Sequence, residues 1–163
     1  MESLHQFSLA LAGEHSPEAA ARRCVAWLVE APGMALARLW LGEPDALQLA
    51  ASAEPASRKK RTPWPEVLGD SPPGDGVIGR LARARESLGV ENLQADPAWK
   101  AHHDWLRGEG IVGFGGVSLE AGGEWIGIVA VFRRRPVDRS ALATLSTAAG
   151  HTAAAIERGR AFA

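Results

Sequence analysis

The chain has 163 residues, of which 46% are hydrophobic and 23% are charged, a length and composition typical of one globular domain. Its 18 basic and 19 acidic residues leave a net charge of -1, which argues against binding to nucleic acid or to an anionic membrane. A single cysteine excludes a disulfide framework, and without a signal peptide or a long apolar run we expect a cytoplasmic domain.

Two helices are predicted at the start of the chain. The first is expected within residues 1–13, where apolar residues recur at helical spacing: Leu4, Phe7 and Leu11. The second begins at Ser16-Pro17-Glu18, in which a capping residue precedes a proline and an acidic residue. Its apolar stripe includes Cys24, which we interpret as a buried structural thiol.

A β-hairpin and a long loop follow. The strands are expected at Met34–Leu41 and Ala46–Ala53, on either side of a Gly-Glu-Pro-Asp turn. Residues from Glu54 to Pro73 contain five prolines and no apolar periodicity, which indicates a loop. We interpret its basic run Arg58–Arg61, beside Trp64, as a solvated surface rather than a nucleic-acid site.

The second half of the chain alternates helices and strands. We expect them at Asp75–Ser87 (helix), Leu88–Leu93 (strand), Asp96–Arg107 (helix), Ile111–Leu119 (strand), Glu124–Phe132 (strand) and from Val137 to the end (helix). Two hairpins imply a mostly antiparallel sheet, and helices at the ends and in the middle imply cover on both of its faces. The predicted fold class is therefore α+β.

Two motifs have a functional and a structural interpretation. Gly74–Gly79 matches G-x-G-x-x-G, but the preceding Ser71-Pro72-Pro73 is no strand, so a turn into a helix is favoured over a dinucleotide site. An anion held at that helix end by Arg80 or Arg83 remains an alternative. His102-His103-Asp104 lacks the helical spacing of zinc ligands.

His102 shares an apolar helix face with Trp99 and Trp105, so three roles stay open for it. It is a hydrogen-bonded core residue, a pocket residue that contacts a ligand, or an axial haem ligand. No nucleophile stands beside a general base, so we expect neither an enzyme nor a bound metal or cofactor.

The last helix carries small residues at heptad spacing: Ala141, Ala148 and Ala155. Together with the Leu4–Leu11 seam of the first helix, this row is expected to form the interface of a homodimer.

Five segments follow one another in a characteristic order and spacing: Gly74–Gly79, Val90–Leu93 leading into Asp96-Pro97, Gly110–Leu119, Glu124–Phe132 and the alanine-rich last helix. In the order and spacing of these segments the chain resembles the GAF domain family of sensor domains. The resemblance implies a central antiparallel sheet of five or six strands, with terminal helices on one face and shorter helices on the other. Residues 1–163 would then be one sensor domain, with 1–13 and 137–163 as dimerisation or signalling helices.

The resemblance also implies a function. The resemblance predicts a sensor domain of a bacterial signalling protein. An unknown small molecule would bind the domain and rearrange the helices of a homodimer. The dimer would in turn control an output domain, which could be a kinase, a cyclase or a transcription activator. A scaffold module without ligand and a haem-based sensor are the alternatives. Ser118 departs from a proline common in the family, and the signature of cyclic-nucleotide binders is missing. The family's methionine sulfoxide reductases use several cysteines, whereas this chain has Cys24 alone.

The ligand is expected between the sheet and the helices at Val77–Arg85 and Pro97–Arg107. Gly113, Gly115 and Gly116 would leave the sheet bare there, while large rings hold the helix away. An apolar lining with one polar group is typical of small-molecule sites, and the histidine would make binding depend on pH. The predicted lining is Val77, Trp99, His102, Trp105 and Phe114.

Overall fold

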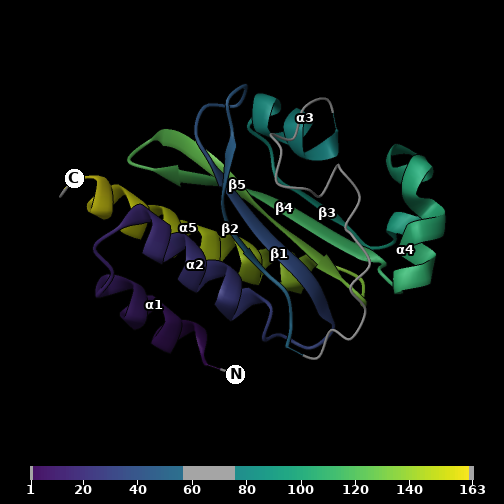
Figure 1. The fold of residues 1–163 in the computed structure, drawn as a ribbon, viewed down its shortest axis with the longest axis horizontal. Coiled ribbons are helices and arrows are strands. Elements are labelled where there is room, and N and C mark those ends of the chain that lie inside the picture. Colours follow the sequence, from purple (N-terminus) through teal and green to yellow (C-terminus); the bar gives the residue numbers. More distant parts are fainter. Residues whose placement is uncertain (1, 57–75, 162–163) are drawn as a thin grey trace.

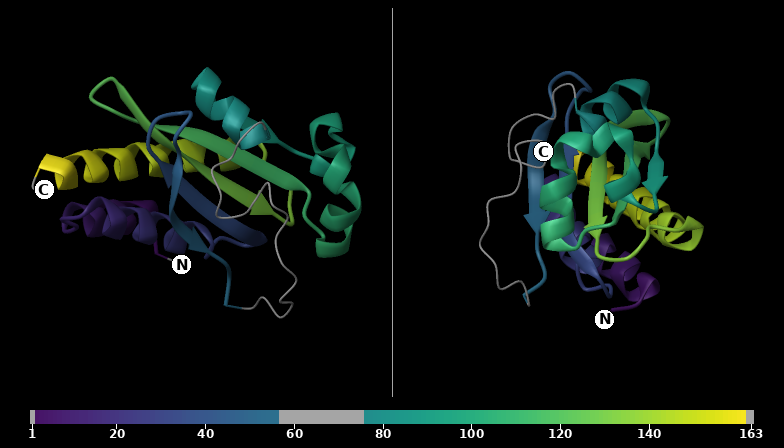
Figure 2. Two further views of the ribbon diagram at one scale, coloured as in Figure 1. Left: turned by 45° about the horizontal axis from the view of Figure 1, so that its top comes forward. Right: turned by 90° about the vertical axis from the view of Figure 1, so that its right-hand side faces the viewer.

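The computed structural model describes residues 2–56 and 76–161, which form a five-stranded sheet with helices on both faces (Figures 1 and 2). The predicted basic run Arg58–Arg61, Trp64 and Gly74 lie outside the described residues. The strands are β1 (Met34–Leu41), β2 (Gln48–Ala53), β3 (Leu88–Val90), β4 (Gly113–Ala121) and β5 (Glu124–Arg133). The helices are α1 (Leu4–Ala12), α2 (Pro17–Leu28), α3 (Val77–Ala84), η2 (Leu93–Ala95), η3 (Pro97–His102), α4 (His103–Glu109) and α5 (Arg139–Ala161).

The sheet has the strand order β2-β1-β5-β4-β3, and each pair of neighbours is antiparallel. Val131 pairs with Ala37 of β1 on one side and with Gly115 of β4 on the other, so β5 is the central strand. The predicted α+β class and antiparallel sheet are thereby confirmed.

Alternate residues of β5 belong to two separate cores. Val129 and Val131 pack with α1, α2 and α5, whereas Ile128 and Phe132 pack with α3, η3 and α4. Successive side chains of a strand point to opposite faces, so both faces of this strand are apolar because both are covered. Figure 1 shows the terminal helices and the shorter helices on opposite sides, as predicted.

Serine side chains cap the first two helices, and the cap expected at Ser16 is confirmed. Ser16 Oγ accepts a hydrogen bond from the Ala19 amide at 3.1 Å, and Ser3 and Gln6 form a capping box at the start of α1. Helix α1 then packs on α2 through Phe7, whose ring is stacked on Trp27 at a centroid distance of 4.7 Å.

The homodimer prediction assumes that the Leu4–Leu11 seam and the alanine row of the last helix are exposed, but the structure shows that they are mostly covered within the chain. Phe7 and Leu11 of α1 are 0% and 1% exposed, and Ala148 and Ala155 of α5 are 0% and 1% exposed, all within a single chain. Helix α5 lies against both α1 and α2 as well as β4, which covers the predicted seam. Four of the six residues expected to meet a partner are therefore core residues, and the other two, Leu4 and Ala141, are half-buried.

The helix expected at Asp96–Arg107 is broken into η3 and α4. The Trp99 amide bonds to the Asp96 carbonyl three residues earlier at 3.0 Å, the pattern of a 3-10 helix. Successive side chains of this segment therefore point in directions around the helix axis that differ from those of an α-helix. Trp99 and Leu106 are buried, whereas His102 and Trp105 are only half-buried.

Candidate functional site

Helix α3 forms one wall of the candidate site. Gly76 precedes its first residue, and the helix buries Val77, Ile78 and Leu81 against the sheet. The helix ends at Ala84, and the following Arg85 has a φ of 56° in the left-handed region, as is common after the last turn of a helix. Of the two glycines in the G-x-x-G part of the motif, Gly76 precedes the helix and Gly79 is buried in its first turn.

The opposite wall is η3, held at its start by Asp96. Asp96 Oδ1 accepts a hydrogen bond from the Ala98 amide at 2.9 Å. His103 Nε2 donates to the Asp96 carbonyl at 2.8 Å, which fixes the start of α4 against the start of η3. This role of His103 is not visible in the sequence, because the bond exists only where the 3-10 segment brings residues 96 and 103 together.

Trp99 is the central side chain of this wall. It is 1% exposed, and its ring lies 5.4 Å from Phe114 and 5.7 Å from Phe132, measured between centroids. The two phenylalanine rings are 5.2 Å apart, so the three form one aromatic cluster over β4 and β5.

A cavity of about 240 Å³ lies between α3 and η3. This is enough space for a small ligand, since an apolar cavity of about 150 Å³ holds a benzene ring in another protein. Its lining is Val77, Arg80, Leu81, Ala84, Glu86, Leu88, Asp96, Ala98 and Trp99.

The structure brings two of the five predicted site residues onto this cavity, Val77 and Trp99. Phe114 is fully buried in contact with the Trp99 ring. His102 lies edge-on to the same ring at 6.5 Å, and neither His102 nor Trp105 is part of the lining. Glu86 and Asp96 also line the cavity and were not predicted from the sequence, although the Asp-Pro capping signal marks the position of Asp96.

The glycines of β4 do not leave the sheet hollow. A Cβ on Gly116 would lie 3.0 Å from Leu81 Cδ1 and 3.0 Å from Phe114 Cζ. A Cβ on Gly115 would point to the other face, 3.0 Å from Leu145 Cδ2 of α5. Both layers therefore pack closely onto β4, and the cavity extends toward Glu86 and Leu88 beside the edge strand β3 instead.

The cavity combines an apolar floor with polar groups. Val77, Leu81 and Trp99 are all less than 9% exposed, whereas Arg80 and Glu86 are exposed and Asp96 is half-buried. The indole N–H of Trp99 is buried and has no hydrogen-bond acceptor among the described residues. A buried donor without an acceptor costs about 1–3 kcal/mol relative to a satisfied one. Several buried indole N–H groups of this structure share that state, and among the described residues Trp99 is the one that lines the cavity.

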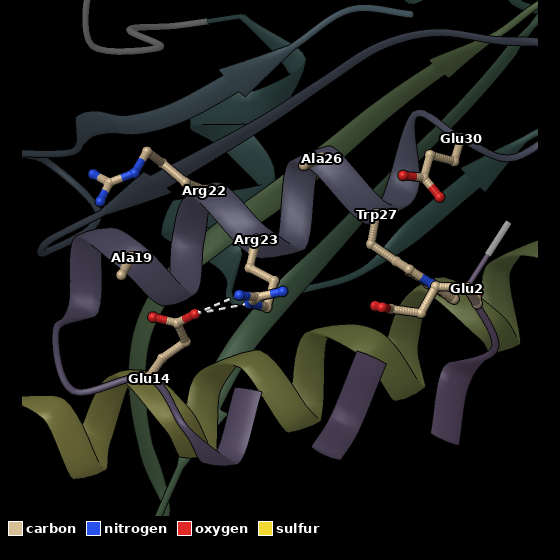
Figure 3. A pocket seen from close by; sticks show the side chains of 8 residues that line it. All are labelled: Glu2, Glu14, Ala19, Arg22, Arg23, Ala26, Trp27 and Glu30. Carbon is tan, nitrogen blue, oxygen red and sulfur yellow. Dashed lines mark hydrogen bonds and ion pairs between the residues drawn. The ribbon is translucent and has the colours of Figure 1, made fainter. Parts of the chain in front are cut away.

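A second depression of about 470 Å³ lies on the outer side of α1 and α2 (Figure 3). Arg23 pairs with Glu14 at 2.8 Å, and the Trp27 indole N–H donates to the Glu2 carbonyl at 2.7 Å. These groups satisfy one another, and most of the lining is charged side chains in contact with solvent. The depression therefore has the character of a solvated groove between two helices.

Cys24 of α2 is fully buried in the core that the terminal helices form with one face of the sheet. Burial raises the pKa of its thiol to about 11, and a hydrogen bond with Thr152 only partly opposes the increase. A thiol in this state is a poor nucleophile. Among residues 2–56 and 76–161, no three histidine, cysteine or carboxylate side chains are grouped so as to hold a metal ion.

None of the helices in those two ranges is both long and apolar enough to cross a membrane.

The family model of the GAF domain matches residues 3–156. The GAF domain of a phosphoenolpyruvate-protein phosphotransferase (ptsP) from Coxiella burnetii is 25% identical over 98% of this chain and 93% of its own, with a TM-score of 0.71. The free methionine-R-sulfoxide reductase from Neisseria meningitidis is 21% identical over 98% and 89%, with a TM-score of 0.74.

Residues 122 to 287 of a methyl-accepting chemotaxis protein are 19% identical over 96% of this chain and 98% of theirs, with a TM-score of 0.68. No curated protein matches the chain.

Proposed function

Because the chain belongs to the GAF domain family, we propose that it is a regulatory domain that senses a small molecule in the cavity between α3 and η3. The observation that carries the proposal is the buried indole N–H of Trp99, which has no acceptor among the described residues and belongs to a side chain on the cavity wall. A ligand that supplies an acceptor removes the cost of this unsatisfied donor.

The lining defines the chemistry of the ligand. The apolar floor of Val77, Leu81 and Trp99 fits a small apolar body, and the volume of about 240 Å³ limits its size. The acceptor for Trp99 is a carbonyl, carboxylate, hydroxyl or ether oxygen. Arg80, Glu86 and Asp96 in the lining favour a ligand that also carries polar groups.

The packing of β4 supports a route from this cavity to the last helix. Leu81, which lines the cavity, packs on Gly116, and the adjacent Gly115 packs on Leu145 of α5. With no side chain on either glycine, the two helical layers are separated by little more than one strand. A ligand that shifts α3 therefore acts on α5 through this strand in our proposal, and α5 passes the change to an output domain.

Homodimerisation remains part of the proposal, on a surface different from the one first expected. Leu9 of α1 is 62% exposed. The outer face of α5 has small exposed residues that allow a second helix to approach closely: Ala143, Ser146, Thr147, Gly150 and Ala154. The exposed leucine and this small-residue face support a dimer through α1 and α5.

A regulatory role is favoured over an enzymatic one. The reductase among the similar structures shows that an enzyme can share this fold. In this chain the only cysteine is Cys24, which is buried and has a raised pKa. We further propose that the domain acts in the cytoplasm of a bacterium within a signalling protein, in line with the chemotaxis protein among its structural neighbours.

A thermal-shift screen of small metabolites on two variants tests the site. Ala98 and Ala101 are both exposed residues of η3, but only Ala98 lines the cavity. A compound that stabilises the wild type is expected to stabilise Ala101→Trp equally and Ala98→Trp at least tenfold more weakly in apparent affinity. Equal stabilisation of both variants would place the binding site elsewhere.

A further inference from the structure

A third cavity lies on the opposite face of the sheet, among the terminal helices. It has a volume of about 170 Å³ and is bounded by the end of α2, the start of β1, the end of β5 and the start of α5. Apolar cavities of about 150 Å³ bind a benzene ring in other proteins. Its lining is Trp27, Leu28, Ala31, Met34, Val131, Arg133, Val137, Ala141, Thr144 and Leu145.

Among the residues that the structure describes, Arg133 is the only charged one in this lining, and no described aspartate or glutamate contributes to it. The side chain continues the alternation of Val129 and Val131 along β5, so the strand directs it to the face of α2 and α5. Eight of the other nine lining residues are apolar, and Thr144 adds a hydroxyl group.

The guanidinium of Arg133 is only partly satisfied. Its Nη1 donates to the Pro136 carbonyl at 3.3 Å, whereas its Nε is buried and has no acceptor among the described residues. No described carboxylate pairs with it, although its neighbour Arg134 pairs with Glu109. A partly buried cation is normally paired, so the free Nε and the lack of an acidic neighbour mark a place for an anion.

We propose that this cavity binds a small monocarboxylate whose apolar body is about the size of a benzene ring. The carboxylate accepts hydrogen bonds from Arg133, and the ring or short chain replaces empty space beside Val131, Val137 and Leu145. Because the cavity touches the first turns of α5, its occupant acts on the same helix as the proposed sensing site. The two sites are separate in space, since they lie on opposite faces of the sheet and share no residue.

Benzoate is a suitable probe, and benzamide is its uncharged control of the same shape. We expect benzoate to raise the unfolding midpoint of the full chain in a saturable manner, and benzamide to bind at least tenfold more weakly. Arg133→Met removes the cation and is expected to weaken benzoate at least tenfold. Arg139→Met, which removes an exposed charge outside the lining, is expected to bind like the wild type.

A second variant keeps the test decisive if Arg133→Met does not fold. Ala141 is half-buried in the lining, and Ala141→Phe is expected to fill the cavity and abolish the response to benzoate. Ala98→Trp, at the other cavity, is expected to leave the benzoate response unchanged, which separates this proposal from the proposed sensing site. No saturable benzoate binding at millimolar concentration, or unchanged binding in Arg133→Met or Ala141→Phe, would overturn the assignment.

Discussion

The ring of Trp99 packs against that of Phe114 at a centroid distance of 5.4 Å and an interplanar angle of 49°. This contact joins η3 to β4 and places the indole between the aromatic cluster and the cavity below α3. Trp99 therefore has two roles, as a core residue and as part of the candidate site.

These two roles are separable by substitution. Trp99→Ala is expected to lower the free energy of unfolding by about 3–5 kcal/mol, because it removes a large buried ring. Trp99→Phe keeps a ring against Phe114 and Phe132 and removes the unsatisfied N–H, so its cost is expected to be less than half as large. Urea denaturation of both variants measures the difference, and equal losses would contradict the assigned packing.

The buried thiol of Cys24 is expected to make the free energy of unfolding depend on pH. Its pKa is raised by burial to about 11 from 9.0, so the thiol ionises earlier in the unfolded chain than in the folded one. The protonated thiol contributes fully to the free energy of unfolding below pH 9. This contribution, about 2–3 kcal/mol in total, is lost as the pH rises toward 11.

Cys24→Ala lacks this contribution and serves as the control. Urea denaturation under reducing conditions at both ends of that range is expected to show a larger loss for the wild type than for the variant. Identical losses would show that the thiol is not buried as described.

The predicted dimer is testable at Leu9. The leucine is 62% exposed on α1, and Leu9→Glu is expected to convert a dimer of twice the 17.3 kDa chain mass into a monomer in light scattering. Leu88→Glu is the matched control, because Leu88 is also exposed but lies on the edge strand β3. A wild-type protein that stays monomeric at high concentration would refute the dimer.

The structure changes what is expected of His102. The His102 ring lies 6.5 Å from the Trp99 ring, between centroids, and is not part of the cavity lining. We therefore expect no direct contact between His102 and a ligand in the cavity. His102→Ala is therefore expected to keep at least half of the ligand-induced thermal shift that Ala98→Trp loses. If His102→Ala loses as much of the ligand-induced thermal shift as Ala98→Trp, His102 contacts the ligand and this expectation is wrong.

The elements with the clearest local signals were predicted best. Residues Met34–Leu41 of β1 have the predicted bounds, because an apolar β-rich run lies between Pro32-Gly33 and a turn. Ser16 caps α2 as expected. The order of helices and strands was sufficient to indicate the layers of the sheet and its helices.

The failures concern geometry that local sequence does not specify. Asp96-Pro97 begins a 3-10 helix and an α-helix equally well, so the break at His103 and the resulting positions of His102 and Trp105 were not visible in the sequence. The direction of each β4 glycine depends on the strand's alternation, which places Gly115 and Gly116 on opposite faces. Leu81 and Leu145 fill those faces from helices distant in sequence.

The indole N–H of Trp99 offers the most direct test of the sensing site. One of the six tryptophan indole resonances in a ¹H–¹⁵N spectrum is assigned to Trp99 by its absence in Trp99→Phe. Titration with a compound that stabilises the protein is expected to shift this resonance, with saturation at the concentration that saturates the thermal shift. A Trp99 resonance that stays unmoved while the compound binds would contradict the proposed site.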